Sequence, residues 1–282
     1  MQFPIFKQFS SHAVTHKNMT NLIEISEYRL ILAKVLNQSP EWVFMHLPNI
    51  NLTPLQKKML NDMVQRRLNS EPIAKILGYK EFYGRNFITS ASTLDPRPDS
   101  ETLIDAIVQC YEKDYSYQIL DLGLGTGCLL FTLLCELPHA VGVGIDYSFA
   151  ALNIAKKNQE FLHLKDRSVC VQGNWVEAIK GKFDLIVSNP PYIGTFELLD
   201  SSTMHDPHSA LFSGLTGLEA YQKIIPQLNL LLKPFGKIFL EIGKGQELCV
   251  ANIALSCGLK NQGVFPDLSG TIRVLCYSAD NK

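Results

Sequence analysis

The sequence predicts an α/β protein: a mostly parallel sheet covered by helices on both faces, ending in an antiparallel hairpin and preceded by a small helical domain. From residue 118 onward, short apolar runs alternate with longer segments of helical spacing, which is typical of repeated strand and helix units. Before residue 70, apolar side chains instead recur three and four positions apart. The chain has 282 residues, 46% hydrophobic and 19% charged, so it can bury enough apolar surface to offset the entropy lost on folding.

Residues 19–70 are predicted to form the helical domain, and residues 1–18 a disordered extension before a second methionine. Ser39 and Thr53 each stand before a proline, which places a hydroxyl N-cap ahead of a proline at the first helical position. The apolar residues at helical spacing are expected to form the core of this domain: Leu22, Ile23, Tyr28, Ile31, Leu32, Val35, Leu55, Met59, Leu60, Met63, Val64 and Leu68.

Residues 71–95 are predicted to be a linker that contains a β-hairpin. Short apolar pairs at 82–83 and 87–88 flank a turn that the pattern places at residues 84–86. The proline-rich stretch 94–100 then interrupts regular structure, because each proline restricts its own φ angle and the residue before it.

Residues 96–282 are predicted to form the sheet domain. Strands are expected at 119–122, 141–146, 169–171, 183–188 and 237–242, separated by helices around 127–136, 148–158 and 217–232. The last two apolar runs, 263–268 and 271–276, are too close together for a crossover helix. They therefore predict an antiparallel hairpin at the edge of the sheet.

Charge and cysteine usage exclude several classes of protein. The 26 basic and 27 acidic side chains leave a formal charge of −1, so no broad basic surface is available for nucleic acid or an anionic membrane. The 7 cysteines are scattered without a Cys-x-x-Cys pair, as expected of reduced residues in the cytoplasm, and no ligand spacing predicts a metal site. No apolar run reaches the length of a membrane span.

A glycine-rich turn follows the first predicted strand of the sheet. The turn reads Gly123-Leu124-Gly125-Thr126-Gly127. Glycines let a backbone approach a ligand closely where a Cβ atom would clash. Asp121 precedes the turn, and a nearby acid suits a cofactor with a positively charged amino-acid group better than one with a pyrophosphate. The turn therefore favours S-adenosylmethionine over a nicotinamide cofactor.

Two residues after the next strands extend the candidate cofactor site. Asp146 ends the second strand, where an acid can accept hydrogen bonds from both ribose hydroxyls of an adenosine. A second role, which can coexist with the first, is to cap the helix that starts near Ser148. Trp175 follows the third strand, where its ring either flanks an adenine or belongs to the core.

The motif after the fourth strand suits methylation of a planar nitrogen. It reads Asn189-Pro190-Pro191-Tyr192, and its prolines end the strand and stiffen the loop. Because the lone pair of an amide or aromatic amino nitrogen is delocalised, the substrate needs acceptors that hold its N–H bonds and direct the nitrogen at the methyl group. The Asn189 side-chain oxygen and the Pro190 carbonyl can be those acceptors, and Tyr192 can stack on the planar group.

An ordered set of motifs extends from about residue 71 to residue 277. Its members are Glu71-Pro72-Ile73-Ala74 with Gly78 and Glu81-Phe82, Pro96-Arg97-Pro98-Asp99-Ser100-Glu101, the glycine-rich turn, Asn189 to Ile193, Ala210-Leu211 with Gly214 to Tyr221, Leu240-Glu241-Ile242-Gly243 with Gln246, and Asp267-Leu268-Ser269-Gly270 before Arg273. In this set the chain resembles the peptide chain release factor N5-glutamine methyltransferases, the HemK-like proteins.

The resemblance implies a seven-stranded, Rossmann-like class I methyltransferase sheet after a helical domain that recognises the substrate. It implies methyl transfer from S-adenosylmethionine to the side-chain nitrogen N5 of the glutamine in the Gly-Gly-Gln motif of class I release factors, proteins of translation termination. We expect a monomer. The implied cofactor residues are Gly123, Leu124, Gly125, Thr126, Gly127, Asp146, Trp175 and Asn189. The implied substrate residues are Asn189, Pro190, Pro191 and Tyr192, of which Asn189, Pro190 and Tyr192 are catalytic.

Two alternatives remain. Asn-Pro-Pro-Tyr also occurs in N6-adenine and N2-guanine nucleic-acid methyltransferases, although basic residues cluster here only at 57–58, 66–67 and 156–157. The other alternative is a binding protein that keeps the fold without turnover, against which the intact motif at Asn189 argues.

Overall fold

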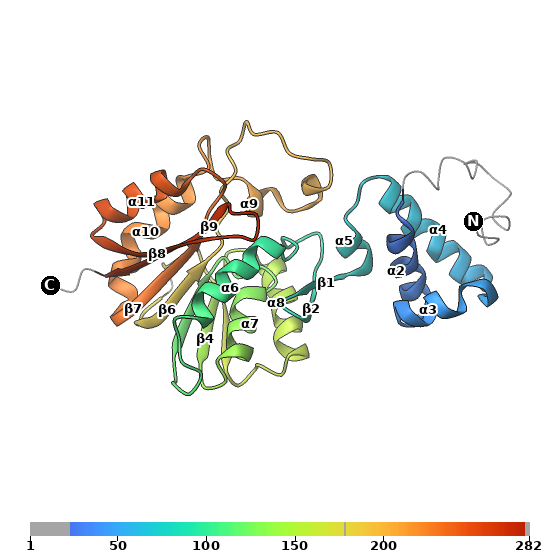
Figure 1. Ribbon diagram of the computed structural model, residues 1–282, viewed down its shortest axis with the longest axis horizontal. Helices are drawn as coiled ribbons and strands as arrows, with labels where there is room; N and C mark the ends of the chain where they lie inside the picture. The colour runs from blue at the N-terminus through green and yellow to red at the C-terminus, as the bar shows by residue number, and fades with distance from the viewer. Residues whose placement is uncertain (1–22, 178, 280–282) are drawn as a thin grey trace. The chain divides into compact units, whose positions relative to one another are not determined.

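The structure is a computed structural model that describes residues 23–177 and 179–279, and it divides into two compact units (Figure 1). One unit runs up to Gly78 and includes Ser201–His205. The other runs from Tyr79 to Asp200 and continues from Asp206. The boundary after Gly78 falls within the predicted linker 71–95. The predicted extension 1–18 and the core residue Leu22 lie outside the described residues.

The first unit is helical. Its elements are α2 (Ile25–Leu36), α3 (Pro40–His46), η2 (Leu47–Asn49), α4 (Pro54–Leu68), α5 (Ile73–Leu77) and η4 (Thr203–His205). Both predicted N-caps are confirmed. The Ser39 hydroxyl accepts a hydrogen bond from the Trp42 amide, and Thr53 forms a reciprocal capping box with Gln56.

The core of the helical unit does not contain all of the apolar residues that the sequence pattern assigns to it. Its buried side chains are Ile31, Leu32, Ala33, Val35, Val43, Leu60, Val64 and Ile76. The assignment of Leu55 and Met59 to this core is wrong, since they are 67% and 39% exposed. Both lie on a helix that has few elements to pack against in so small a unit, so part of its apolar stripe stays in solvent.

The second unit begins with a separate antiparallel hairpin of β1 (Tyr79–Phe82) and β2 (Arg85–Ile88). Its turn consists of Tyr83 and Gly84, not of residues 84–86 as predicted. Both turn residues have positive φ angles, 50° and 70°. A two-residue turn with both φ angles positive matches the right-handed twist of the flanking strands.

The predicted seven-stranded sheet with a terminal antiparallel hairpin is confirmed. Its strands are β3 (Gln118–Leu122), β4 (Val141–Asp146), β5 (Ser168–Gln172), β6 (Phe183–Ser188), β7 (Leu232–Glu241), β8 (Leu259–Pro266) and β9 (Ile272–Ala279). The order is β5-β4-β3-β6-β7-β9-β8, in which β9 runs opposite to the other six strands and is antiparallel to both β7 and β8. β3 therefore lies in the centre of the sheet, and ligands bind beyond the carboxyl ends of such strands.

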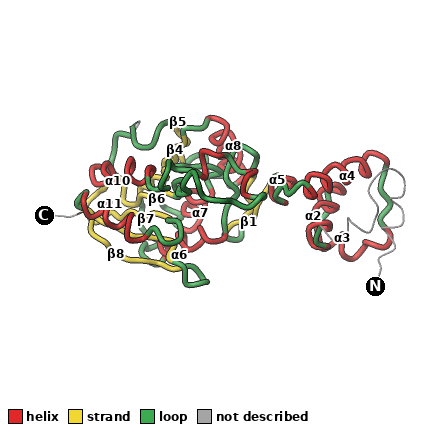
Figure 2. The backbone as a smooth tube through the Cα atoms, turned by 90° about the horizontal axis from the view of Figure 1, so that it is seen from above, coloured by secondary structure: helices red, strands yellow, loops and turns green. Residues whose placement is uncertain are grey.

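Helices cover both faces of the sheet (Figures 1 and 2). On one face lie α6 (Glu101–Val108), α7 (Cys128–Glu136) and α8 (Phe149–Phe161), and on the other α10 (Glu219–Leu231) and α11 (Glu247–Ser256). Two short helical segments, η3 (Pro98–Ser100) and α9 (His208–Leu211), complete the unit. Alternate residues of one strand enter opposite layers. On β6, Leu185 and Val187 pack with α6 and α7, whereas Ile186 packs with α10.

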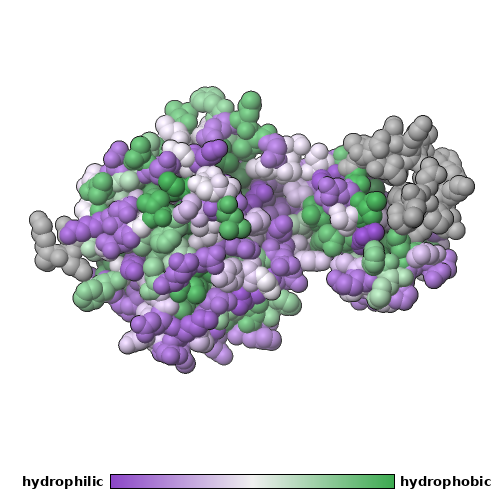
Figure 3. All heavy atoms as spheres, viewed as in Figure 1, coloured by the Kyte–Doolittle hydropathy of each residue, from purple (hydrophilic) through white to green (hydrophobic). Residues whose placement is uncertain are grey.

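Polar side chains predominate over much of the face of this unit seen in Figure 3, with apolar residues scattered among them. None of the described helices has the length and apolar composition needed to cross a bilayer.

Candidate active site

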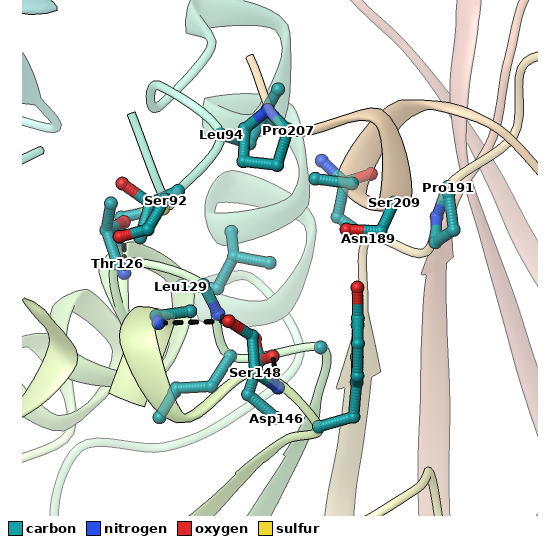
Figure 4. Close-up of a pocket in the computed structure, with 18 of the residues that line it drawn as sticks. Ser92, Leu94, Thr126, Leu129, Asp146, Ser148, Asn189, Pro191, Pro207 and Ser209 are labelled. Atoms are coloured by element: carbon teal, nitrogen blue, oxygen red, sulfur yellow. Dashed lines mark hydrogen bonds between the residues drawn. The ribbon is translucent and has the colours of Figure 1, made fainter. Parts of the chain in front are cut away.

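A pocket of about 420 Å³ lies at the carboxyl ends of the parallel strands in the second unit (Figure 4). Its lining residues come from the segments 92–100, 123–129, 145–151, 173–175, 189–191 and 207–210. The predicted site residues that line it are Gly123, Leu124, Gly125, Thr126, Asp146, Trp175, Asn189 and Pro191. Gly127, Pro190 and Tyr192 are not among the lining residues.

The three glycines of the turn have different physical roles. Gly123, Gly125 and Gly127 all have positive φ angles, of 85°, 55° and 81°. A Cβ atom on Gly127 would lie 2.2 Å from the Phe131 ring, so this glycine lets the turn pack on α7. A Cβ atom on Gly123 would meet nothing closer than the Trp175 ring at 3.8 Å. Gly123 and Gly125 therefore leave the backbone open to a ligand, while Gly127 is structural.

Asp146 joins the end of β4 to the glycine-rich turn. Its carboxylate accepts hydrogen bonds from the Gly125 amide at 2.8 Å and the Ser148 amide at 2.9 Å (Figure 4). Burial raises the pKa of Asp146, against the opposing effect of these two amides. The N-cap of α8 is Ser148, whose hydroxyl accepts from the Ala151 amide, so the helix-cap alternative for Asp146 is wrong. The carboxylate braces the turn and keeps lone pairs for a ligand in the pocket.

Asp121 is a buried acid directly before the turn. Both of its carboxylate oxygens are buried and have no hydrogen-bond partner among the described residues. Burial raises its pKa from 3.8 to about 7; the Leu130 backbone amide opposes this rise, and the charge of Asp146 adds to it. An unpaired buried carboxylate costs free energy that a cationic ligand group could recover.

Cys128 lines the pocket beside the turn but is a poor nucleophile. Burial raises the pKa of its thiol to about 12, so the reactive thiolate is scarce at neutral pH. The described residues contain no cluster of three or more side chains able to hold a metal ion.

Asn189 reaches the pocket from the end of β6, opposite the glycine-rich turn (Figure 4). Its side-chain nitrogen donates to the Ser100 hydroxyl at 3.2 Å. Within the described residues, neither the Asn189 side-chain oxygen nor the Pro190 carbonyl accepts a hydrogen bond. The two acceptors that the sequence assigns to the substrate amide are therefore available.

Tyr192 packs behind the pocket. It contacts the apolar layer that contains α10 and α11, and burial raises the pKa of its hydroxyl. The Gln246 side chain donates to its backbone carbonyl at 2.8 Å, which fixes the loop after the prolines. The stacking role assigned to Tyr192 from the sequence stays a prediction.

A polar wall contributed by residues 92–97 and 207–210 was not foreseen. Arg97 lines the pocket and forms an ion pair at 2.6 Å with Asp206, which is buried. Asp206 also accepts from the Asp95 amide at 3.4 Å, and Asp95 accepts from the Thr89 hydroxyl. In the sequence, only the motif Pro96 to Glu101 could have indicated this wall. The spacing of its residues does not by itself predict a binding site.

Two protein families match the two parts of the chain. Residues 23–78 match the PrmC N-terminal domain, and residues 90–202 match the methyltransferase small domain.

Curated relatives cover the whole chain. The chain is 38% identical to a release factor glutamine methyltransferase of Agrobacterium fabrum over 88% of this chain and 88% of that protein. It is 38% identical to one of Rhodospirillum rubrum over 88% of this chain and 76% of that protein. It is 37% identical to a bifunctional methyltransferase of Rickettsia felis over 100% of this chain and 59% of that protein, so it spans little more than half of this longer relative.

Solved structures share the fold. The catalytic domain of hMettl16, in complex with an RNA hairpin, aligns with a TM-score of 0.56 and 18% identity over 77% of this chain and 82% of that one. The 16S rRNA N2 G1207 methyltransferase of T. Thermophilus aligns with a TM-score of 0.50 and 21% identity over 71% of this chain and 49% of that one.

Proposed function

The chain belongs to the release factor glutamine methyltransferase family, and on this premise we propose that it methylates the side-chain nitrogen N5 of a glutamine in class I peptide chain release factors. The glutamine would be that of the Gly-Gly-Gln motif. The observation that carries the proposal is the pocket itself, in which Asn189, with its side-chain oxygen free, lies opposite a glycine-rich turn braced by Asp146. The Pro190 carbonyl, which also accepts no hydrogen bond in the described structure, follows directly after it in the chain.

The residues of the pocket fit S-adenosylmethionine as the methyl donor. Asp146 can accept from ribose hydroxyls, and the Trp175 ring lines the pocket where it can flank an adenine. Asp121 does not line the pocket, but its buried carboxylate stands two residues before Gly123. Its negative charge favours a cationic ammonium group over an anionic pyrophosphate. When bound, this cofactor supplies a methyl group attached to a positively charged sulfur.

Asn189 and Pro190 would hold the reacting nitrogen. Their two free oxygens can each accept one N–H bond of the substrate carboxamide, which orients that nitrogen at the methyl group and favours an in-line approach. Positioning of the substrate then supplies most of the rate enhancement. Cys128 does not supply it as a nucleophile, because burial keeps the pKa of its thiol at about 12 and the thiolate is scarce.

The test is a competition between substrates. The purified protein, with methyl-labelled S-adenosylmethionine, would be offered a class I release factor, the same factor with its Gly-Gly-Gln glutamine changed to alanine, RNA and DNA. Label should enter the unmodified factor alone. Label in adenine or guanine, or undiminished label in the altered factor, would replace this function with nucleic-acid methylation or another protein site.

We propose in addition that the helical unit recognises the release factor. Lys57 and Lys58 are exposed on α4 and can attract an acidic surface, whereas Arg66 and Arg67 are paired with Glu71 and Glu27 inside the unit. We also propose that the protein acts as a monomer in the cytoplasm, since the substrate is a component of translation. Light scattering with and without release factor would test the oligomeric state.

A further inference from the structure

Glu241 is a buried acid that the proposed reaction leaves without a task. It is 1% exposed at the end of β7, and its Oε2 atom has no hydrogen-bond partner among the described residues. β7 runs parallel to β6 with Leu240 opposite Ser188. The next residues along the chain, Glu241 at the end of β7 and Asn189 just after β6, therefore lie at the same edge of the sheet. A buried carboxylate is costly and calls for a compensating role.

Ser100 connects the two side chains. It ends η3, is 3% exposed, and accepts the hydrogen bond from the Asn189 side-chain nitrogen at 3.2 Å. Ser100 and Asn189 also act to lower the pKa of the Glu241 carboxyl, against the burial that raises it, so both favour its charged form. The three groups thus form one cluster at the edge of the pocket: Ser100 and Asn189 line the pocket, and Glu241 is buried outside its lining.

The chemistry of these groups determines which end of the Asn189 carboxamide faces the pocket. A hydroxyl both donates and accepts, so Ser100 alone would tolerate either end of the amide. A carboxylate only accepts. When the Ser100 proton points to Glu241, the Ser100 oxygen is left as an acceptor, which selects the NH₂ end of Asn189 and turns the amide oxygen away from the cluster.

We propose that Glu241 is a positioning residue that, through Ser100, holds the Asn189 side-chain oxygen toward the substrate. The proposal rests on the proposed function, because it assigns Asn189 the task of accepting a substrate N–H bond. Without the carboxylate, Ser100 can donate to the Asn189 oxygen, and the flipped amide would then present donors to the donors of the substrate.

Protonation of Glu241 should have the same effect as its removal. Burial raises the pKa of Glu241 to about 7, so on the acid side of neutrality the cluster loses a group that can only accept and gains one that can also donate. Glu241 is electrostatically coupled to five titratable groups on different elements and loops. They are Arg273, Asp99, Tyr192, Tyr221 and Cys128. Among them, Arg273 favours the charged form and Asp99 opposes it.

Steady-state kinetics of Glu241→Gln would measure the positioning effect. We expect kcat to fall about tenfold or more, which corresponds to the loss of about one hydrogen bond. The KM values for release factor and S-adenosylmethionine should stay within about twofold of wild type. The acid limb of kcat/KM should become less steep, because one titrating group is gone. The matched control is Glu160→Gln, an exposed acid that pairs with Lys165 and does not line the pocket, which should leave kcat unchanged.

A titration of the protein without substrate tests the same cluster independently of activity. The Glu241 carboxyl would be followed by carbon NMR in wild type, Ser100→Ala and Asn189→Ala. Each substitution removes a group that favours the charged form, so the Glu241 pKa should rise in both variants. Ser100→Thr, which keeps the hydroxyl, should restore both the pKa and kcat.

The outcomes separate this proposal from the proposed function. Wild-type kcat in Glu241→Gln, or a Glu241 pKa that moves in neither Ser100→Ala nor Asn189→Ala, would overturn the positioning role. If Glu241→Gln does not fold, Ser100→Ala gives the kinetic answer. If the wild type fails to methylate release factor, the proposed function is wrong, while the titration still decides whether the cluster exists.

Discussion

Replacing Asp121 by asparagine should make the protein more stable above neutral pH and weaken its binding of S-adenosylmethionine. The carboxylate is buried, lacks a hydrogen-bond partner in the described structure, and has its pKa raised from 3.8 to about 7 by burial. Asparagine has nearly the same shape and carries no charge. The variant should therefore escape the cost of a buried ion and lose the attraction to an ammonium group.

The magnitude follows from the difference in pKa between the folded and unfolded chain. Each pKa unit corresponds to about 1.4 kcal/mol. Below pH 3.8 the acid is protonated in both states. Between pH 3.8 and about 7 the unfolded chain ionises first, so stability falls as pH rises, and above that range the loss is constant. Between pH 5 and pH 8, ionisation of Asp121 should therefore lower the free energy of unfolding of the wild type by about 3 kcal/mol. Asp121→Asn should not show this loss.

Urea unfolding at several pH values between 5 and 8 would measure this difference. The decline in the free energy of unfolding should be flatter in Asp121→Asn than in wild type, and calorimetry should show weaker S-adenosylmethionine binding. Glu160→Gln is the control, since Lys165 lowers the pKa of Glu160 and its removal cannot flatten the decline. Parallel pH curves for wild type and Asp121→Asn, together with equal cofactor affinity, would refute the reasoning.

Three further predictions concern the pocket and the helical unit. Asn189→Ala should lower kcat about a hundredfold, because the substrate nitrogen loses its orienting acceptor, and single-turnover methyl transfer would measure it; a loss of less than about threefold would contradict the role. Asp146→Ala should weaken S-adenosylmethionine binding by about 1.5–3 kcal/mol for each charge-assisted hydrogen bond lost, as read by calorimetry, and an unchanged affinity would exclude ribose binding by this acid. Lys58→Glu should raise the KM for release factor about threefold without changing cofactor affinity. The control is Lys157→Glu on α8; an equal rise in its KM would show that the effect is not specific to the helical unit.

The strands were predictable where apolar runs are continuous and bounded by turn residues. β6 has the predicted bounds, Phe183–Ser188, because both of its faces are buried and it therefore reads as one apolar run. β7 begins at Leu232, earlier than the predicted residue 237, since Pro234 and Gly236 resemble the end of an element in sequence. The turn at Tyr83 was misplaced for a related reason: a tyrosine with positive φ is uncommon, and only pairing of the flanking strands imposes it.

The site was predictable only where a motif combines glycine or proline with a strand end. Gly123, Asp146 and Asn189 meet in one pocket, as parallel strands require. In the sequence, Ser100 and Glu241 stood out only as members of the motifs shared with the release factor methyltransferases. A single serine and a single glutamate have no spacing that predicts a role, and their meaning comes from the pairing of β6 with β7 and from the position of η3.

Mass spectrometry of the release factor after reaction would test the central claim most directly. The factor would be incubated with S-adenosylmethionine and either wild-type protein or Asn189→Ala, then digested, and the peptide containing Gly-Gly-Gln would be fragmented. We predict one added methyl group on the side-chain nitrogen of that glutamine with wild type, and little or none with the variant. An unmodified Gly-Gly-Gln peptide with active wild-type protein, or a methyl group on any other residue, would contradict the account.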